Sequence, residues 1–142
     1  MQKDYNEAVK WSLRAAEQGH PDAQLLLALC YGEGTGVQKN LEKCVEWSRK
    51  AAEQNNANAQ FLLASSYANG SGVQKDYNEA VKWFRKAAEQ DLPDAQYNLG
   101  ACYANGSGVQ KDHNEAVKWF RKAAEQGYVK AEQALKILKN NK

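Results

Sequence analysis

The stretch ANGSGVQKDYNEAVKWFRKAAEQ, residues 68–90, decides the fold of this chain. It returns over residues 104–126 with a single change, His113 in place of Tyr77. The four tryptophans that mark the copies are each 36 residues apart: Trp11, Trp47, Trp83 and Trp119. A regular period of this length is typical of stacked supersecondary units, so the sequence predicts a repeat array rather than a globule with one central core.

The second half of each repeat predicts a helix, called helix B, that begins at a cap. Asp76 followed three residues later by Glu79 has the form of a capping box. The following apolar residues recur every three or four positions and make one broad face. The same box is expected at Asp4–Glu7 and Asp112–Glu115, and Asn40 keeps the cap where Lys43 replaces the glutamate.

Helix B is expected to end at a left-handed residue. Glycine, asparagine and aspartate tolerate that backbone best, and these types occupy the equivalent positions Gly19, Asn55, Asp91 and Gly127. Pro21 and Pro93 follow closely and suit the first turn of the next helix, called helix A. Small residues on helices A and B predict close crossings at Ala28–Cys44, Ala64–Ala80 and Gly100–Ala116.

The predicted order is therefore B, A, B, A, B, A, B, A, within one domain over residues 1–142. Helix B over 5–18 is followed by repeats at 21–54, 57–90 and 93–126, and by a polar capping helix at 129–139. No helix A precedes residues 5–18. Part of the apolar face formed by Ala8, Trp11 and Ala15 is therefore expected to be exposed, which predicts self-association through this helix.

Composition excludes several functional classes. Nineteen basic and seventeen acidic residues leave a net charge of +2, too small to indicate nucleic acid or an anionic membrane. No apolar run is long enough to span a bilayer. The segment 1–11 lacks the apolar core of a signal peptide, and cytoplasm, periplasm and secretion all stay open.

Candidate catalytic and cofactor chemistry is weak throughout the chain. Three cysteines at uneven spacing are neither a disulfide framework nor a metal site, so free thiols are expected. The GSGVQK loop follows a helix, whereas a phosphate loop precedes one, so we interpret it as a turn. His20 and His113 lie far apart in the repeat pattern, and neither belongs to a recognisable catalytic arrangement of residues. The tryptophans are interpreted as core, not as a stacking ladder.

The repeat motif resembles a known family. Leu99-Gly100-x-x-Tyr103, Gly106-x-Gly108-Val109-x-Lys111-Asp112, Glu115-Ala116-Val117-Lys118-Trp119 and Ala123-Ala124-Glu125-Gln126-Gly127 resemble the Sel1-like repeat, a relative of the tetratricopeptide repeat. The resemblance implies an all-α solenoid, a right-handed superhelix of antiparallel helix pairs, that acts as a non-enzymatic scaffold or adaptor. A cysteine-rich bacterial branch of the family carries one disulfide per repeat. This chain has Ala52 and Gln60 at such positions, which argues against both those disulfides and lactam binding.

The resemblance to tetratricopeptide arrays implies that helix A of each repeat lines the inner, concave surface of the solenoid. Its positions vary between repeats while their packing neighbours do not, which predicts a groove for an extended peptide or an amphipathic helix. The expected groove residues are Leu25, Leu29, Glu33, Phe61, Ser65, Asn69, Tyr97, Ala101 and Asn105.

The sequence leaves four functional readings. The first is a scaffold that binds a protein partner, with no cofactor and no metal. The second is an excised or consensus-like module without an evolved ligand, favoured by the near identity of 68–90 and 104–126. An RNA-binding helical array would need basic groove positions, and the expected ones have none. A lactam-binding or lactam-hydrolysing enzyme would need a nucleophile with a base partner.

Overall fold

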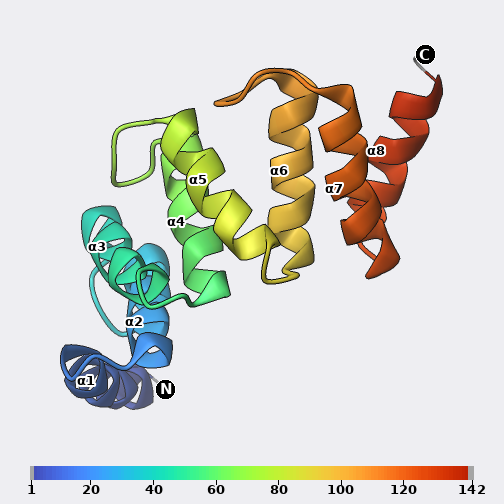
Figure 1. Cartoon of the computed structure of the whole chain (residues 1–142). Coiled ribbons are helices and arrows are strands. Elements are labelled where there is room, and N and C mark those ends of the chain that lie inside the picture. The colour runs from blue at the N-terminus through green and yellow to red at the C-terminus, as the bar shows by residue number, and fades with distance from the viewer. Residues whose placement is uncertain (1, 141–142) are drawn as a thin grey trace. The chain divides into compact units, whose positions relative to one another are not determined.

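The computed structural model describes residues 2–140, with side chains from residue 6 onward. Over this range the chain forms eight α-helices and no strand (Figure 1), which confirms the predicted all-α fold of helix pairs. The helices are α1 (Gln2–Glu17), α2 (Pro21–Glu33), α3 (Leu41–Ala52), α4 (Ala57–Asn69), α5 (Tyr77–Ala88), α6 (Pro93–Asn105), α7 (His113–Glu125) and α8 (Val129–Asn140).

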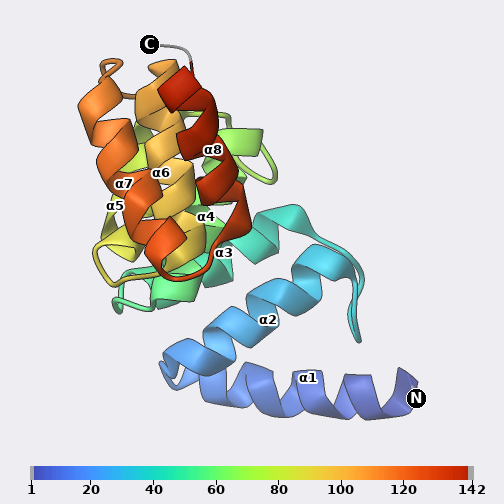
Figure 2. The same ribbon diagram turned by 90° about the vertical axis from the view of Figure 1, so that its right-hand side faces the viewer.

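The helices group into two compact units, Met1–Lys75 and Asp76–Lys142. In the first unit each helix packs on the next, from α1 to α4, and in the second the same holds from α5 to α8. Figure 2 shows the chain reversing direction between α1 and α2, and again between α7 and α8. The single domain expected over residues 1–142 stays a prediction.

The predicted caps of three helices B are confirmed. The backbone N–H groups of Asn78 and Glu79 donate to the side chain of Asp76, at 3.0 and 3.2 Å. Asp112 accepts from the N–H of Glu115 at 3.1 Å, and Asn40 accepts from Lys43 at 3.1 Å. Each cap satisfies donors that the first helical turn leaves without an intrahelical partner.

The cap predicted at Asp4 is wrong, because α1 begins at Gln2 and residue 4 lies within the helix. In later repeats a hydrogen bond to the preceding helix A, such as Asp112 N–H to Tyr103 O at 3.0 Å, accompanies the extended cap residue. In α1 residue 4 lies inside the helix instead, so its backbone is helical where the later cap residues are extended.

The predicted left-handed helix ends are confirmed. Asn55 and Asp91 have φ of 71° and 67°, and Gly19 and Gly127 have φ of 94° and 84°. Pro21 and Pro93 stand in the first turns of α2 and α6. These short connections return the chain antiparallel to the helix before it.

Small residues allow the close crossings within each unit. A Cβ on Gly100 would lie 3.2 Å from the carbonyl oxygen of Ala116 and 2.8 Å from the ring of Phe120, which confirms the predicted close approach of Gly100 to Ala116. In the first unit, a Cβ on Gly32 would lie 3.2 Å from Cys44 Sγ, one turn beyond the predicted Ala28. The Ala28–Cys44 and Ala64–Ala80 contacts stay predictions.

The tryptophans divide by position. Trp83 and Trp119 are 6% and 5% exposed and belong to the core, as predicted for helix B. Trp11 on α1 is 64% exposed, so the interpretation as core is wrong for this tryptophan, and the expectation that the face of the first helix is open is met. Lysines lie over the buried rings, with Lys82 Nζ 5.5 Å from the Trp83 ring and Lys118 Nζ 5.2 Å from the Trp119 ring. Their aliphatic stems thus shield the edges of the core from water.

Candidate functional site

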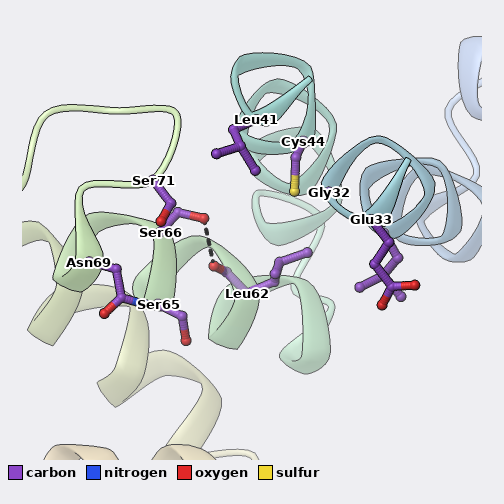
Figure 3. A pocket seen from close by; sticks show the side chains of 10 residues that line it. Gly32, Glu33, Leu41, Cys44, Leu62, Ser65, Ser66, Asn69 and Ser71 are labelled. Carbon is purple, nitrogen blue, oxygen red and sulfur yellow. Dashed lines mark hydrogen bonds between the residues drawn. The ribbon is translucent and has the colours of Figure 1, made fainter. Parts of the chain in front are cut away.

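A hollow in the first unit brings together four of the nine predicted groove residues. It has a volume of about 250 Å³ and lies among α2, α3 and α4 (Figure 3). Leu29, Glu33, Ser65 and Asn69 line it together with Gly32, Leu41, Cys44, Leu62, Ser66 and Ser71. Ser66 Oγ donates to the Leu62 carbonyl at 3.1 Å, which satisfies this hydroxyl within its own helix.

A second hollow, of about 340 Å³, lies between α1 and α2. Leu29 and Glu33 line both hollows, so the two adjoin at these residues. The other residues of the second hollow are Ala8, Val9, Ser12, Leu26, Cys30 and Thr35. We call the two hollows together the α2 groove.

The α2 groove exposes large apolar side chains. Leu26, Leu29 and Leu41 are 48%, 40% and 39% exposed. Single exposed leucines are ordinary on protein surfaces. Three of them around two adjoining hollows form a patch of the kind that marks an interaction site.

The remaining predicted residues lie elsewhere. Leu25 and Phe61 are half-buried and line neither hollow of the α2 groove. In the second unit, the ring of Tyr97 packs 5.5 Å from Phe120 and 5.3 Å from Tyr128, measured between centroids. Ala101 packs in the same cluster, and Asn105 is exposed. Tyr97 and Ala101 therefore contribute to packing in this unit.

Sequence reasoning missed three leucines of the α2 groove: Leu26, Leu41 and Leu62. A signal for them was present. Leu26 and Leu62 correspond to the polar Asn98 of the last repeat, and Leu41 corresponds to Tyr77 and His113. An apolar residue where other repeats are polar or amphipathic indicates a local surface feature.

Sequence reasoning also missed a set of buried glutamines on helix A. Gln24, Gln60 and Gln96 are at most 4% exposed. Their Nε2 atoms donate to the carbonyls of Ala16, Ala52 and Ala88 at the end of the preceding helix B, at 3.1–3.2 Å. Gln54 donates to Gln24 Oε1 at 2.8 Å, and Gln126 donates to Gln96 Oε1 at 3.0 Å.

These amides add a second donor to carbonyls that already accept from the backbone N–H three residues on, as Asn55 N–H does to Ala52 O at 3.0 Å, and the bonds satisfy the buried amide groups themselves. The pair Ala52–Gln60 is also where the resemblance places the disulfide of the cysteine-rich branch. In this chain a hydrogen bond joins the two positions, and Cys30, Cys44 and Cys102 are all free thiols.

Burial controls the chemistry of these thiols. Desolvation raises the pKa of Cys102 to about 11 and also raises the pKa of Cys44. Burial raises the pKa of Cys30, and the neighbouring Glu33 carboxylate raises it further. A raised pKa lowers the thiolate fraction at neutral pH, so none of the three has the activated thiolate of a nucleophilic cysteine.

Thiol labelling should follow this order. We expect Cys30, which is half-buried, to react first with a thiol reagent at pH 8. Because its thiolate fraction at pH 8 is smaller, Cys102 should react about 100-fold more slowly than a thiol of pKa 9. Its labelling rate should rise as the pH approaches 11. Mass spectrometry of partly labelled protein measures both. Fast labelling of Cys102 at pH 8 in the folded protein would contradict the assignment.

No described group of three or more histidine, cysteine, aspartate or glutamate residues is placed to hold a metal ion. None of the helices between residues 2 and 140 combines the length and the apolar character needed to cross a bilayer. The residues that line the α2 groove are leucines and smaller apolar residues, neutral polar residues such as Ser65 and Asn69, and one carboxylate, Glu33.

Comparison with known proteins gives the family. The Sel1 repeat model matches residues 1–20, 21–56, 57–92 and 93–128. Among solved structures, the chain is similar to c5321, a protective antigen of uropathogenic Escherichia coli that displays an SLR fold. The two are 44% identical, the TM-score is 0.86, and the match covers 89% of this chain and 27% of that one.

Two further structures are similar. A Sel1 repeat protein of Oxalobacter formigenes is 41% identical with a TM-score of 0.86, covering 93% of this chain and 54% of that one. Cysteine rich protein B of Helicobacter pylori is 29% identical with a TM-score of 0.75, covering 95% and 97%. No curated protein matches the sequence. Four copies of the matching motif over residues 1–128 show that the chain belongs to the Sel1 repeat family.

Proposed function

We propose that this chain is a non-enzymatic protein-interaction module that binds a peptide segment of a partner in the α2 groove. Sel1 repeat proteins are commonly interaction scaffolds, and their repeats present side chains from successive helices to one partner. The observation that carries the proposal is the exposure of Leu26, Leu29 and Leu41 around two adjoining hollows. An apolar groove of this kind suits the apolar face of a peptide.

Site-directed photo-crosslinking tests the proposal. A photoreactive phenylalanine analogue is placed at Leu29, and the protein is illuminated in a lysate of its source cells. Leu29 lines both hollows, so crosslinked partner peptides are expected there and can be sequenced by mass spectrometry. Adding Leu26→Ser should abolish the crosslinks, because it removes one wall of the groove.

The matched control places the same analogue at Ile137, which is 59% exposed on α8 and lines neither hollow. The proposal expects no shared crosslinked product at this position. Equal capture at both positions, or capture unaffected by Leu26→Ser, would show that the α2 groove is not the binding site.

The open face of α1 supports a second association, between two copies of this chain. Trp11 is 64% exposed, with the Arg14 guanidinium 5.2 Å from the centroid of its ring. Helices B with a preceding helix A in their own unit bury the equivalent residue better, as Trp119 shows at 5%. A twofold pairing of two α1 faces would remove this apolar surface from water.

Light scattering over a concentration series tests the pairing. The unmodified chain should approach the mass of a dimer at high micromolar concentration, and Trp11→Lys should remain a monomer because the charge cannot be buried. A monomer mass for the unmodified chain over the whole series would contradict the pairing.

A further inference from the structure

Glu33 is the one charged side chain among the residues that line the α2 groove. It lies in the last turn of α2, exposed, and it has no ion-pair partner among the described residues. Leucines line both hollows that Glu33 borders, Leu26 and Leu29 in one and Leu29, Leu41 and Leu62 in the other, beside neutral hydroxyl and amide side chains. The electrostatic character of this groove is therefore that of a single carboxylate.

The backbone adds to the negative potential. The last turns of α2 and α4 both reach the hollow of Figure 3, through Glu33 and Asn69. Neither last turn contains a basic residue. The C-terminus of a helix carries a partial negative charge, which a cation nearby would offset. The effect of Glu33 within the groove is visible at Cys30, whose pKa it raises in addition to burial.

We propose that the partner segment bound in the α2 groove is an amphipathic helix with a lysine or arginine between two apolar residues. The apolar residues enter the two hollows on either side of Leu29, and the cation meets Glu33. The inference rests on the proposed peptide-binding function and specifies the chemistry of the peptide.

The dimensions of the groove fit a short helical segment. Leu26, Leu29 and Glu33 lie at positions i, i+3 and i+7 of α2, a stripe about 10 Å long at 1.5 Å per residue. A facing helix presents apolar residues at the same spacing over two turns. An acidic peptide would place like charge beside Glu33 and the helix ends, which opposes binding.

A selection from a phage-displayed library of 16-residue, helix-favouring peptides tests the proposal. Apolar, basic, acidic and neutral polar residues enter each position in equal shares. Peptides are selected on the full chain and counter-selected on its Leu29→Glu variant. We expect the selected sequences to carry a basic residue flanked by apolar ones at helical spacing. Leu29→Ser should weaken their binding about 30-fold, as loss of a central apolar anchor does.

A charge exchange then isolates the role of Glu33. Glu33→Lys should weaken binding of a selected peptide several-fold, and replacing the basic residue of that peptide by glutamate should restore it. The exchange should have less effect in 1 M NaCl, because salt screens an exposed pair. Glu132→Lys, an exposed glutamate on α8 outside the groove, is the matched control.

The outcomes separate the two proposals. If no peptide is enriched, or if the selected peptides ignore Leu29→Ser, the α2 groove does not bind peptides and both proposals fail. If binding depends on Leu29 while the selected peptides lack a basic residue, or Glu33→Lys and its peptide exchange have no effect, the proposed function stands and the cation inference is wrong.

Discussion

Replacement of Trp83 by alanine is expected to lower the free energy of unfolding by about 3–5 kcal/mol, as large-to-small changes of buried aromatic residues do. The side chain is 6% exposed. Its truncation leaves a cavity in the packing between helices, and such packing is a main contribution to the stability of a repeat array. Urea denaturation monitored by circular dichroism measures the change.

Two variants control for this effect. Trp11→Ala, at the equivalent position of α1, should change the free energy of unfolding by less than about 1 kcal/mol at low protein concentration, because that ring is 64% exposed. Trp83→Phe should cost less than Trp83→Ala, because the indole N–H has no hydrogen-bond partner among the described residues. Equal losses for Trp11→Ala and Trp83→Ala would contradict the division of the tryptophans into exposed and core.

Replacement of Gly108 by alanine is expected to destabilise the fold by about 3 kcal/mol or more. A left-handed backbone costs an alanine about 1–2 kcal/mol, and Gly108 has φ of 73°. In addition, the new Cβ would lie 2.3 Å from the carbonyl oxygen of Tyr77 at the start of α5. Backbone at that distance must move, and overpacking of this kind adds about 1–3 kcal/mol.

Gly127→Ala is the matched control in the same unit. Gly127 also has a positive φ, of 84°, and no heavy atom lies within 4 Å of the added Cβ. This variant should show the backbone cost alone, so the difference between the two midpoints in thermal denaturation measures the clash. Gly72→Ala should behave like Gly108→Ala, since its Cβ would lie 2.2 Å from the carbonyl oxygen of Leu41. Equal stability of Gly108→Ala and Gly127→Ala would contradict the close approach.

The loop after helix A, Gly106-x-Gly108-Val109, shows that a glycine can be required by the local backbone conformation or by a contact with a distant part of the chain. A glycine after helix A is predictable from the sequence, because a helix end needs a left-handed residue, and Gly106 takes that role with φ of 71°. The second glycine, Gly108, has a left-handed backbone too and a further reason. Gly108 is needed because the loop lies against the first residue of a helix B about thirty residues earlier, and no local pattern indicates that approach.

The candidate site was predictable only in part. Variation among repeats identified Leu29, Glu33, Ser65 and Asn69, which line a hollow of the first unit. The same reasoning selected Ala101, which has the repeat position of Leu29 and Ser65 and packs against the cluster of Ala116 and Phe120. Position in the repeat is equal, but the neighbours differ, because residues of α8 pack against the same cluster in the second unit.

The sequence by itself determined the helices, their caps and their ends, because each depends on residues within one turn. Asp76 accepts hydrogen bonds from the N–H groups two and three residues on. Asn55 and Asp91 take the left-handed conformation that ends a helix. Only the tertiary structure decided which copies of one motif are buried. Ala8-Val9-Lys10-Trp11 and Ala80-Val81-Lys82-Trp83 are identical, yet the first tryptophan is exposed and the second buried. Burial depends on what packs against a face, and that comes from residues distant in the chain.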